Sequence, residues 1–439
     1  MLAGYPLGFV WRYLPNNPTT KHIFSTVTGL GLMWFAYDWP GVTHTMITTL
    51  ITLAMLKFLP RKYSLPVGWV FNVGYLLVGY YFNSRPDGYH VTWTTPQCVL
   101  TLRLIGMCFD VSDGGLAEDK MDKDAKIRHL KEVPSVLEML SFAYHFGGVL
   151  VGPQYPFAIY DRFVKGTLMP SPRPSSGLAT LKCFVFGVMY LGVSQAFNVF
   201  YPMDLIYSVE YMNSRPYLLR LLDVLICARG FMYKYLGVWK LGEAPNILTG
   251  LSYNGMDKEG NAVWDGVRNI DLAGYEFATR LQDIITNFNI NTNAWMKIYV
   301  MKRLRFLGNK ELSQLGALLF LALWHGMYFG YFAAFIMEFL DMMIERELSK
   351  WTKPYTDPWF AEGATAVQKV LGKIYCVFLW CATAAALAYG AIAYIQLTVE
   401  RTIPVFNAVY WIGHFPHVLF WAYVILKAVL GPKKKKKEA

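Results

Sequence analysis

Apolar segments long enough to cross a membrane alternate with short polar segments along the whole chain. A membrane-spanning helix needs roughly 20 mostly apolar residues. Segments near that length fall at 23–37, 43–59, 65–82, 135–152, 178–202, 217–239, 312–342, 374–397 and 403–430. This pattern predicts an all-α, polytopic transmembrane helical bundle with about 9–12 crossings. We expect residues 1–432 to form one domain.

Two segments depart from this pattern. Residues 95–110 are apolar but shorter and contain Arg103, which is costly to expose to lipid. They are predicted to form a re-entrant or protein-buried helix. Residues 254–287 carry charged and polar residues throughout, interspersed with aromatic ones. This composition is typical of an ordered lid outside the membrane or of an amphipathic segment.

The composition of the chain supports a bilayer as its surroundings. Of its 439 residues, 54% are hydrophobic and only 16% are charged, whereas soluble proteins carry about 25% charged residues. The net charge is +11, and five of the positive charges lie in one run from Lys433 to Lys437. No basic face interleaved with aromatic residues is evident, so we do not expect nucleic acid as a partner.

Residues 433–439 form a polybasic tail after the last apolar segment. The final four residues, Lys436-Lys437-Glu438-Ala439, match the dilysine pattern by which coat machinery retrieves membrane proteins to the endoplasmic reticulum. The alternative is a stop-transfer basic cluster. Both interpretations place the tail in the cytosol, and the first predicts a multi-pass protein of the endoplasmic reticulum membrane.

The cysteines predict neither disulfides nor a metal site. No two of them form a CxxC pair, and most lie in apolar segments, which is typical of buried free thiols. They are Cys98, Cys108, Cys183, Cys227, Cys376 and Cys381.

His325 is the first candidate for chemistry. It lies inside the apolar sequence LLFLALWHGMYFGYFAAF, where an ionisable side chain costs roughly 2.5 kcal/mol or more. A functional role therefore explains it better than packing does. Upstream, residues 287–293 contain four asparagines. On their own, these are explained equally well by helix capping and turns.

Taken together, these segments resemble the membrane-bound O-acyltransferase family. The resemblance rests on FNINTNAW, then KRLRFLGNKELSQ, then ALWHG, in that order. The family pairs a catalytic Asn with a His about three dozen residues later. Its short pattern of Asn, Thr or Ser, and Trp falls on Asn289, Thr292 and Trp295, and His325 follows 36 positions after Asn289.

Further segments make the chain most similar to the type-three lysophosphatidylcholine acyltransferase branch of that family. They are GYPLGFVWRYL, TPQCVLTLRLIGMCFD, VPSVLEMLSF, LVGPQY and NILTGLSYNG. The resemblance implies helices enclosing an intramembrane reaction chamber. It also implies direct transfer of an acyl group, preferentially polyunsaturated, from acyl-CoA, with no cofactor. The implied acceptor is the sn-2 hydroxyl of lysophosphatidylcholine, and also of lysophosphatidylethanolamine and lysophosphatidylserine, in phospholipid remodelling.

The required chemistry suits these residues. A glycerol hydroxyl must lose its proton as its oxygen attacks a thioester, and an imidazole with an ordinary pKa near 6.5 suits that task. We expect His325 to be the general base. Asn289 either orients the reacting groups or donates to the developing oxyanion. A covalent acyl-enzyme on Cys98 or Cys108 is the rival mechanism.

Four basic residues between the proposed catalytic pair are candidates for binding the CoA phosphates. The alternative is ordinary positive-inside flanking. Counting crossings back from a cytosolic tail places these residues on the lumenal side, unless they are buried or an extra half-crossing exists, for example within 345–373. The four residues are Lys302, Arg303, Arg305 and Lys310.

Two other functions remain to be weighed. One is a family member with a sterol, diacylglycerol or protein as acceptor. The other is a transporter with a proton-relay His, which would normally show several intramembrane acids. Apart from Asp223 and Glu338, few acids lie deep in the apolar segments, so transport is disfavoured. A homodimer is a further partner that the sequence leaves open.

Overall fold

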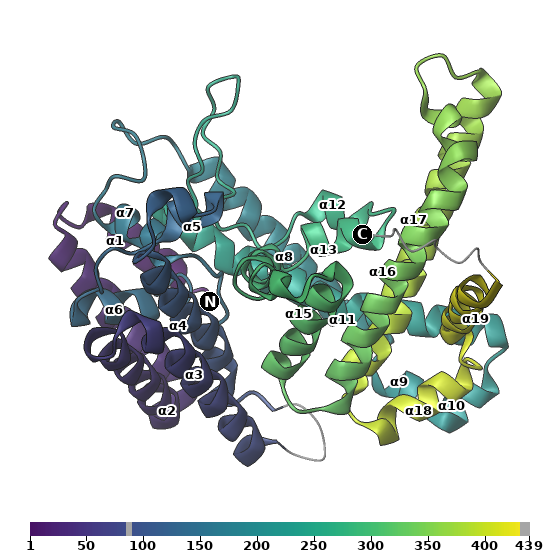
Figure 1. The fold of residues 1–439 in the computed structure, drawn as a ribbon, viewed down its shortest axis with the longest axis horizontal. Coiled ribbons are helices and arrows are strands. Elements are labelled where there is room, and N and C mark those ends of the chain that lie inside the picture. Colours follow the sequence, from purple (N-terminus) through teal and green to yellow (C-terminus); the bar gives the residue numbers. More distant parts are fainter. Residues whose placement is uncertain (85–89, 431–439) are drawn as a thin grey trace, which may run out of the picture.

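The computed structural model describes residues 1–84 and 90–430, and their fold is all-α (Figure 1). Only two isolated β-bridges, Met256 with Ala262 and Ile270 with Phe288, occur in this part of the chain. The predicted fold class is confirmed. The dilysine tail at 433–439 lies outside the described residues.

The helices follow one another as α1 (Gly4–Tyr13), α2 (Pro18–Phe58), α3 (Arg61–Asn83), α4 (Thr94–Asp113), α5 (Lys123–Arg128), α6 (Val136–Ala143), α7 (Phe157–Val164), α8 (Gly177–Phe200), α9 (Asp204–Tyr207), α10 (Val209–Ser214), α11 (Tyr217–Thr249), α12 (Leu272–Glu276), α13 (Leu281–Asn287), α14 (Ile290–Met296), α15 (Lys310–His325), α16 (Phe329–Thr356), α17 (Ala366–Gln396), α18 (Val399–Ala408) and α19 (Phe415–Leu430).

Fewer helices than predicted are long and apolar enough to span a membrane. Within the described residues, α2, α3, α8 together with α9, and α17 meet that condition. The pair of α18 and α19, bent by 89°, could supply a fifth crossing. By length and composition the count is therefore four or five, below the predicted 9–12.

Three predicted segments explain much of this difference. The segments 23–37 and 43–59 belong to the single helix α2, which is kinked at Asp38, where φ is 57°, just before Pro40. Within the segment 135–152, only the eight residues of α6 are helical. The segment 312–342 is divided between α15 and α16. Hydropathy reports apolar stretches, but it does not report where the backbone breaks within them.

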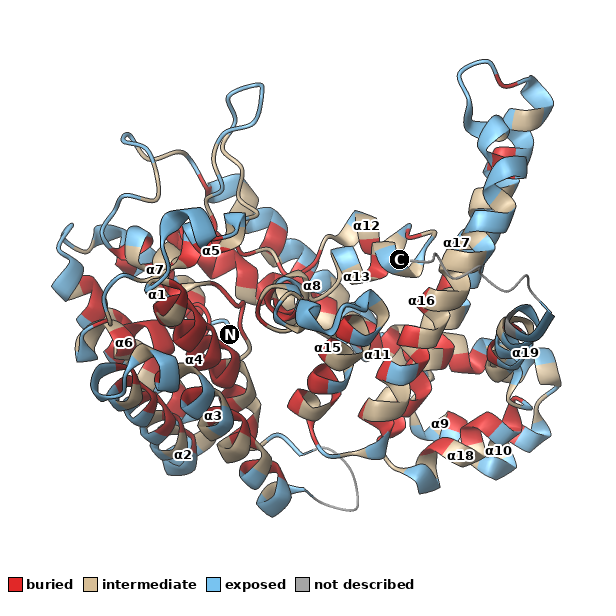
Figure 2. Cartoon of the chain, viewed as in Figure 1, coloured by how far each residue is buried: buried red, intermediate tan, exposed pale blue. Residues whose placement is uncertain are grey.

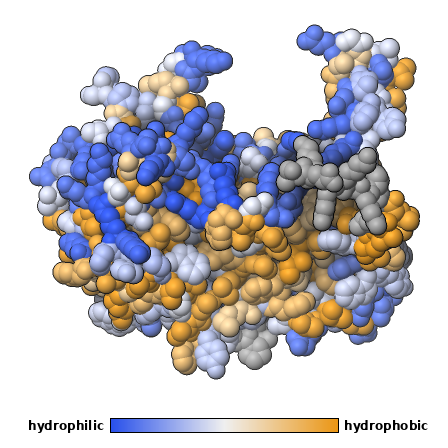
Figure 3. Space-filling model, in the orientation of Figure 1, coloured by the Kyte–Doolittle hydropathy of each residue, from blue (hydrophilic) through white to orange (hydrophobic). Residues whose placement is uncertain are grey.

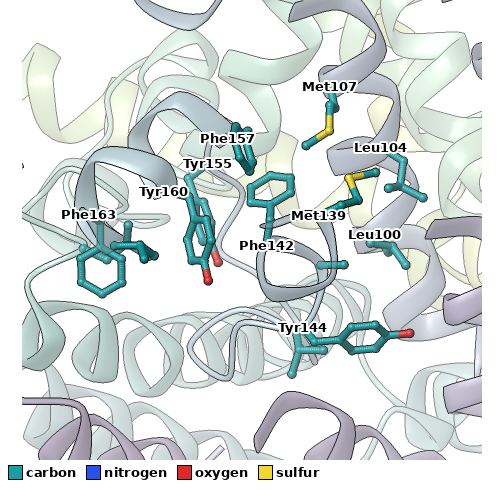
Figure 4. Packing of buried hydrophobic residues seen from close by; sticks show 14 of the residues in the cluster. Leu100, Leu104, Met107, Met139, Phe142, Tyr144, Tyr155, Phe157, Tyr160 and Phe163 are labelled. Carbon is teal, nitrogen blue, oxygen red and sulfur yellow. The ribbon is translucent and has the colours of Figure 1, made fainter. Parts of the chain in front are cut away.

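The predicted protein-buried helix is present as α4. Most of its side chains are buried, including Arg103. The guanidinium of Arg103 donates to the carbonyls of Phe142 at 3.2 Å, Gly148 at 2.8 Å and Pro153 at 3.0 Å. It also lies 4.7 Å from the ring centroid of Tyr155. This charge is tolerated because carbonyls and aromatic rings surround it. Figure 4 shows the core that α4 forms with the aromatic side chains of the segment from α6 to α7.

The surface is divided into a polar and an apolar part. In Figure 3, blue residues cover the upper part of the molecule and a broad orange area covers much of the rest. The paired ends of α16 and α17 project from the body and are largely exposed (Figure 2). The predicted ordered segment 254–287 contains the bridge between Met256 and Ala262, one residue of the second bridge, and the helices α12 and α13.

Candidate active site

His325 lies at the end of a helix, rather than in the middle of one as the sequence suggested. Helix α15 begins after Asn309, whose side chain accepts from the Leu312 amide at 3.0 Å. It ends at His325, because Gly326 adopts φ 146°, a backbone angle that residues other than glycine rarely adopt. Helix α16 then starts at Phe329.

Helices α15 and α16 form an antiparallel hairpin. Arg346 pairs with Glu311 at 3.0 Å, and the Gln314 amide lies 3.3 Å from the Met342 sulfur. The start of α15 therefore lies beside the second half of α16 (Figure 1). The turn at Gly326 divides the apolar segment 312–342, which the count of crossings treated as one span, into these two helices. The half-crossing suggested within 345–373 stays a prediction.

Aromatic side chains from three helices surround the His325 ring. Centroid distances are 4.6 Å to Trp324 of α15, 5.4 Å to Tyr331 and 5.5 Å to Phe335 of α16, and 5.4 Å to Tyr394 of α17. The Tyr394 hydroxyl lies 3.3 Å from His325 Nδ1. Packing of this kind restricts the orientation of the imidazole.

A small cavity with several polar side chains lies beside His325. The Tyr80 hydroxyl on its wall donates to the Trp324 carbonyl at 2.7 Å, which ties α3 to the end of α15. Within the described chain, Nε2 of His325 makes no hydrogen bond. The cavity is lined by Tyr80, Asn83, Ser84, His90, Thr92, Thr94, His325, Gly326 and Tyr328. The imidazole thus adjoins open space.

The structure distinguishes Asn289 from its neighbouring asparagines. Asn291 Nδ2 donates to the Val267 carbonyl at 3.0 Å, and Asn293 Nδ2 donates to the Ile285 carbonyl at 2.8 Å. Both side chains therefore stabilise the backbone of neighbouring segments. Asn289 sits at the N-cap of α14 with φ 50°, and its Oδ1 accepts from Asn269 at 3.3 Å. Its own NH₂ group makes no hydrogen bond to another described residue.

Asn289 and His325 are not in direct contact. No hydrogen bond between described residues joins them, and Asn289 does not line the cavity at His325. Their helices do pack together, since the rings of Trp295 in α14 and Phe320 in α15 stack at 6.1 Å. Joint action of the two side chains therefore requires a substrate between them.

The predicted basic cluster is partly neutralised by aspartates at the end of α4 and in the segment that follows it. Lys302 pairs with Asp122 at 3.1 Å and also with Asp124, and Arg303 pairs with Asp113. The hydrogen bond to Asp124 raises the pKa of Lys302.

The other two members of the cluster are more available to bind a phosphate. Arg305 and Lys310 are exposed and make no ion pair with a described residue. Lys310 opens the 16-residue helix that ends at His325, and such a helix is roughly 24 Å long. The structure thus places this cluster and the imidazole at opposite ends of α15.

The two cysteines considered as rival nucleophiles lie in α4. The Cys98 thiol donates to the Thr95 carbonyl at 3.0 Å, and Cys108 is fully buried. Neither hydrogen-bonds to His325. The described residues therefore form no hydrogen-bonded pair of His325 with either thiol.

Comparison with known proteins bears directly on this site. The sequence profile of the MBOAT, or membrane-bound O-acyltransferase, family matches residues 76–389, which include both Asn289 and His325. The chain belongs to the membrane-bound O-acyltransferase family. The resemblance inferred from the sequence is confirmed, and the chain is a multi-pass membrane protein.

Several relatives are similar to nearly the whole of this chain. The chain is 34% identical over 445 residues to proteins named lysophospholipid acyltransferase 5 in mouse and in human, covering 100% of this chain and 90% of each relative. It is also 34% identical over 433 residues to the protein of that name in Drosophila melanogaster, covering 96% of this chain and 84% of the relative.

Sequence reasoning missed two tyrosines next to His325. Tyr394 lies 69 positions downstream in an apolar helix, and Tyr80 lies 244 positions upstream of Trp324, whose carbonyl it contacts. Neither residue belongs to a motif that the sequence displays. Only the packing of α3, α15 and α17 brings them together.

Proposed function

We propose that this member of the membrane-bound O-acyltransferase family transfers a fatty acyl group from acyl-CoA to the hydroxyl of a lysophospholipid. The observation that carries the proposal is the similarity, over the entire chain, to proteins named lysophospholipid acyltransferase 5. A histidine beside a cavity with polar walls supports it, because the reaction needs a base next to space for a substrate.

In the proposed mechanism, His325 removes the proton of the acceptor hydroxyl as its oxygen attacks the thioester carbon. The carbon–oxygen bond forms and the carbon–sulfur bond breaks. The CoA sulfur then leaves and takes the proton from the imidazolium. No acyl-enzyme forms, so no cysteine is required.

Asn289 has a separate role in this mechanism. Its NH₂ group, which makes no hydrogen bond to another described residue, can donate to the oxygen that becomes negative during transfer, or it can orient the reacting groups. In this mechanism the substrates must therefore reach both Asn289 and His325. The CoA phosphates are proposed to lie at Arg305 and Lys310, with Lys302 and Arg303 participating if their aspartates release them.

The substrates follow from the resemblance to the lysophosphatidylcholine acyltransferase branch. We propose lysophosphatidylcholine as the main acceptor, lysophosphatidylethanolamine and lysophosphatidylserine as further acceptors, and polyunsaturated acyl-CoA as the preferred donor. We also propose residence in the endoplasmic reticulum membrane with a cytosolic C-terminus, on the basis of Lys436 and Lys437.

The proposal is tested with purified protein in lipid nanodiscs. Labelled arachidonoyl-CoA and palmitoyl-CoA are each offered with the three lysophospholipids, diacylglycerol or cholesterol, and the products are separated by chromatography. We expect labelled phosphatidylcholine to form fastest, and with arachidonoyl-CoA. Product from cholesterol or diacylglycerol alone would assign the chain to a different acceptor, and the absence of any acyl product would refute the proposal.

A further inference from the structure

Among the described residues, Tyr394 supplies the side-chain hydrogen bond to His325, and the mechanism above does not use it. Its hydroxyl lies 3.3 Å from His325 Nδ1, and its ring meets the imidazole edge-on at 84°. The Tyr394 hydroxyl also hydrogen-bonds to the hydroxyl of Tyr235 in α11. Three groups from α15, α17 and α11 therefore form a chain that starts at one nitrogen of the imidazole.

A neutral imidazole carries one N–H and one lone pair, so the two nitrogens cannot both be bases. If Nδ1 carries the hydrogen and donates to Tyr394, then the lone pair is on Nε2. If Tyr394 donates to Nδ1 instead, Nε2 carries the hydrogen and cannot accept the proton of a substrate through that atom. The direction of one hydrogen bond thus determines which nitrogen is the base.

Two observations favour Nε2 as the reacting atom. Nδ1 is already covered by Tyr394, whereas Nε2 makes no hydrogen bond to a described residue. His325 also lines the polar cavity. The Tyr394 hydroxyl has one proton and two lone pairs, so it can donate that proton to Tyr235 and accept from Nδ1 through a lone pair.

We propose that Tyr394, supported by Tyr235, is a positioning residue that holds the hydrogen of His325 on Nδ1 and leaves Nε2 as the general base. This inference rests on the proposed acyltransferase function. When His325 takes up the substrate proton, the Nδ1–H bond to Tyr394 persists and strengthens, because its donor is then charged. The two tyrosines transfer no proton in the reaction; they orient the imidazole.

Packing alone is the competing explanation for Tyr394. Its ring lies 5.0 Å from Tyr331 and 6.3 Å from Phe335, so it would help to enclose His325 even without its hydroxyl. Replacement of Tyr by Phe separates these roles, because the ring stays and only the oxygen is lost.

The chain contains a matched control on the same helix. The Tyr389 hydroxyl lies 2.6 Å from Nδ1 of His414, and the Tyr389 ring stacks on Phe406 at 5.1 Å. Tyr389→Phe therefore removes the hydroxyl oxygen from a second tyrosine of α17 that contacts a histidine. That pair does not adjoin the cavity at His325.

The test compares kcat and KM for acyl-CoA and lysophosphatidylcholine among the parent, Tyr394→Phe, Tyr235→Phe, their double variant and Tyr389→Phe, all in nanodiscs. We expect Tyr394→Phe to lower kcat about 10–100-fold, with each KM within about twofold. This range is typical when a metal-ligating histidine loses the hydrogen-bond partner that orients it. Tyr235→Phe should lower kcat less. The double variant should match Tyr394→Phe, because Tyr235 acts through Tyr394. Tyr389→Phe should match the parent.

Two results would overturn the inference. One is a Tyr394→Phe variant whose kcat stays within about twofold of the parent, as for Tyr389→Phe. The other is a double variant whose loss equals the product of the two single losses, because independent effects multiply. Size-exclusion elution of each variant shows whether it is folded. Parent protein that transfers no acyl group would refute the proposed function itself, whereas an active parent with an unaffected Tyr394→Phe refutes only the positioning role.

Discussion

The two ends of α15 differ in how their ionisable groups are held. At the first end, Lys302 and Arg303 are paired with carboxylates on the polar side of the protein, and Arg305 and Lys310 are exposed. At the other end, His325 has aromatic neighbours, one hydroxyl partner and a small cavity. One end suits a hydrated polyanion, and the other suits a reaction that needs little water.

This difference shows why residue type alone does not define a binding site. A cation that is already hydrogen-bonded to a carboxylate must exchange that partner before it can bind a phosphate, so its net contribution is small. An unpaired cation does not have to make this exchange. At the other end, Nε2 of His325 makes no hydrogen bond to a described residue, and this leaves the imidazole available for chemistry.

Apart from the loss of His325 itself, the largest effect is expected from Asn289→Gly. Glycine retains the left-handed backbone of that position, where φ is 50°, but removes the amide group. We expect the transfer rate to fall about 10²–10³-fold if the amide donates to the oxyanion. The rate is measured in nanodiscs with saturating acyl-CoA and lysophosphatidylcholine.

Asn291→Ala is the control for this variant. The Asn291 side-chain amide donates to the carbonyls of Val267 and Arg268. Loss of this amide should lower the free energy of unfolding by about 1–3 kcal/mol. The rate per folded molecule should change much less than for Asn289→Gly. Equal rate losses in the two variants would show that the asparagine cluster has only a structural role.

A smaller effect is expected from Gly326→Ala at the His325 end. Gly326 has φ 146°, and a Cβ there would lie 3.0 Å from Tyr331 Cε2. The substitution should displace the neighbouring imidazole and lower kcat about 10–100-fold. Gly308→Ala is the matched change at the opposite end, where φ is 66° and no atom lies within 4 Å. A kcat that falls equally in both variants would contradict the assignment of the chemistry to the His325 end.

The smallest effect is expected at the basic end. Arg305→Gln combined with Lys310→Gln should raise the KM for acyl-CoA about two- to fivefold per lost charge, leave kcat unchanged, and weaken its dependence on salt. Lys302→Gln should raise that KM less, because Lys302 is already paired with Asp122 and Asp124. An unchanged KM in the double variant would favour ordinary positive-inside flanking.

Much of this architecture could be predicted because it depends on local sequence. Arg103 in a short apolar segment correctly indicated a protein-buried helix. The order of the asparagine cluster and His325 correctly indicated the family. The roles proposed for Asn289, His325 and the basic cluster stay predictions.

Other features could not be predicted because they depend on tertiary contacts or on a single dihedral angle. The turn at Gly326 divides an apolar segment that hydropathy treats as continuous. The pairing of Lys302 with Asp122 joins residues 180 positions apart. Tyr394 adjoins His325 only because α17 packs against α16. No spacing in the sequence reports these contacts.

The most direct test of the account compares purified parent and His325→Ala proteins in nanodiscs, with radiolabelled acyl-CoA and excess lysophosphatidylcholine. Removal of a general base typically costs about 10²–10⁴ in rate. We therefore expect labelled phosphatidylcholine from the parent and almost none from the variant, with equal yield and elution of the two proteins. Equal rates of product formation would show that His325 is not the base.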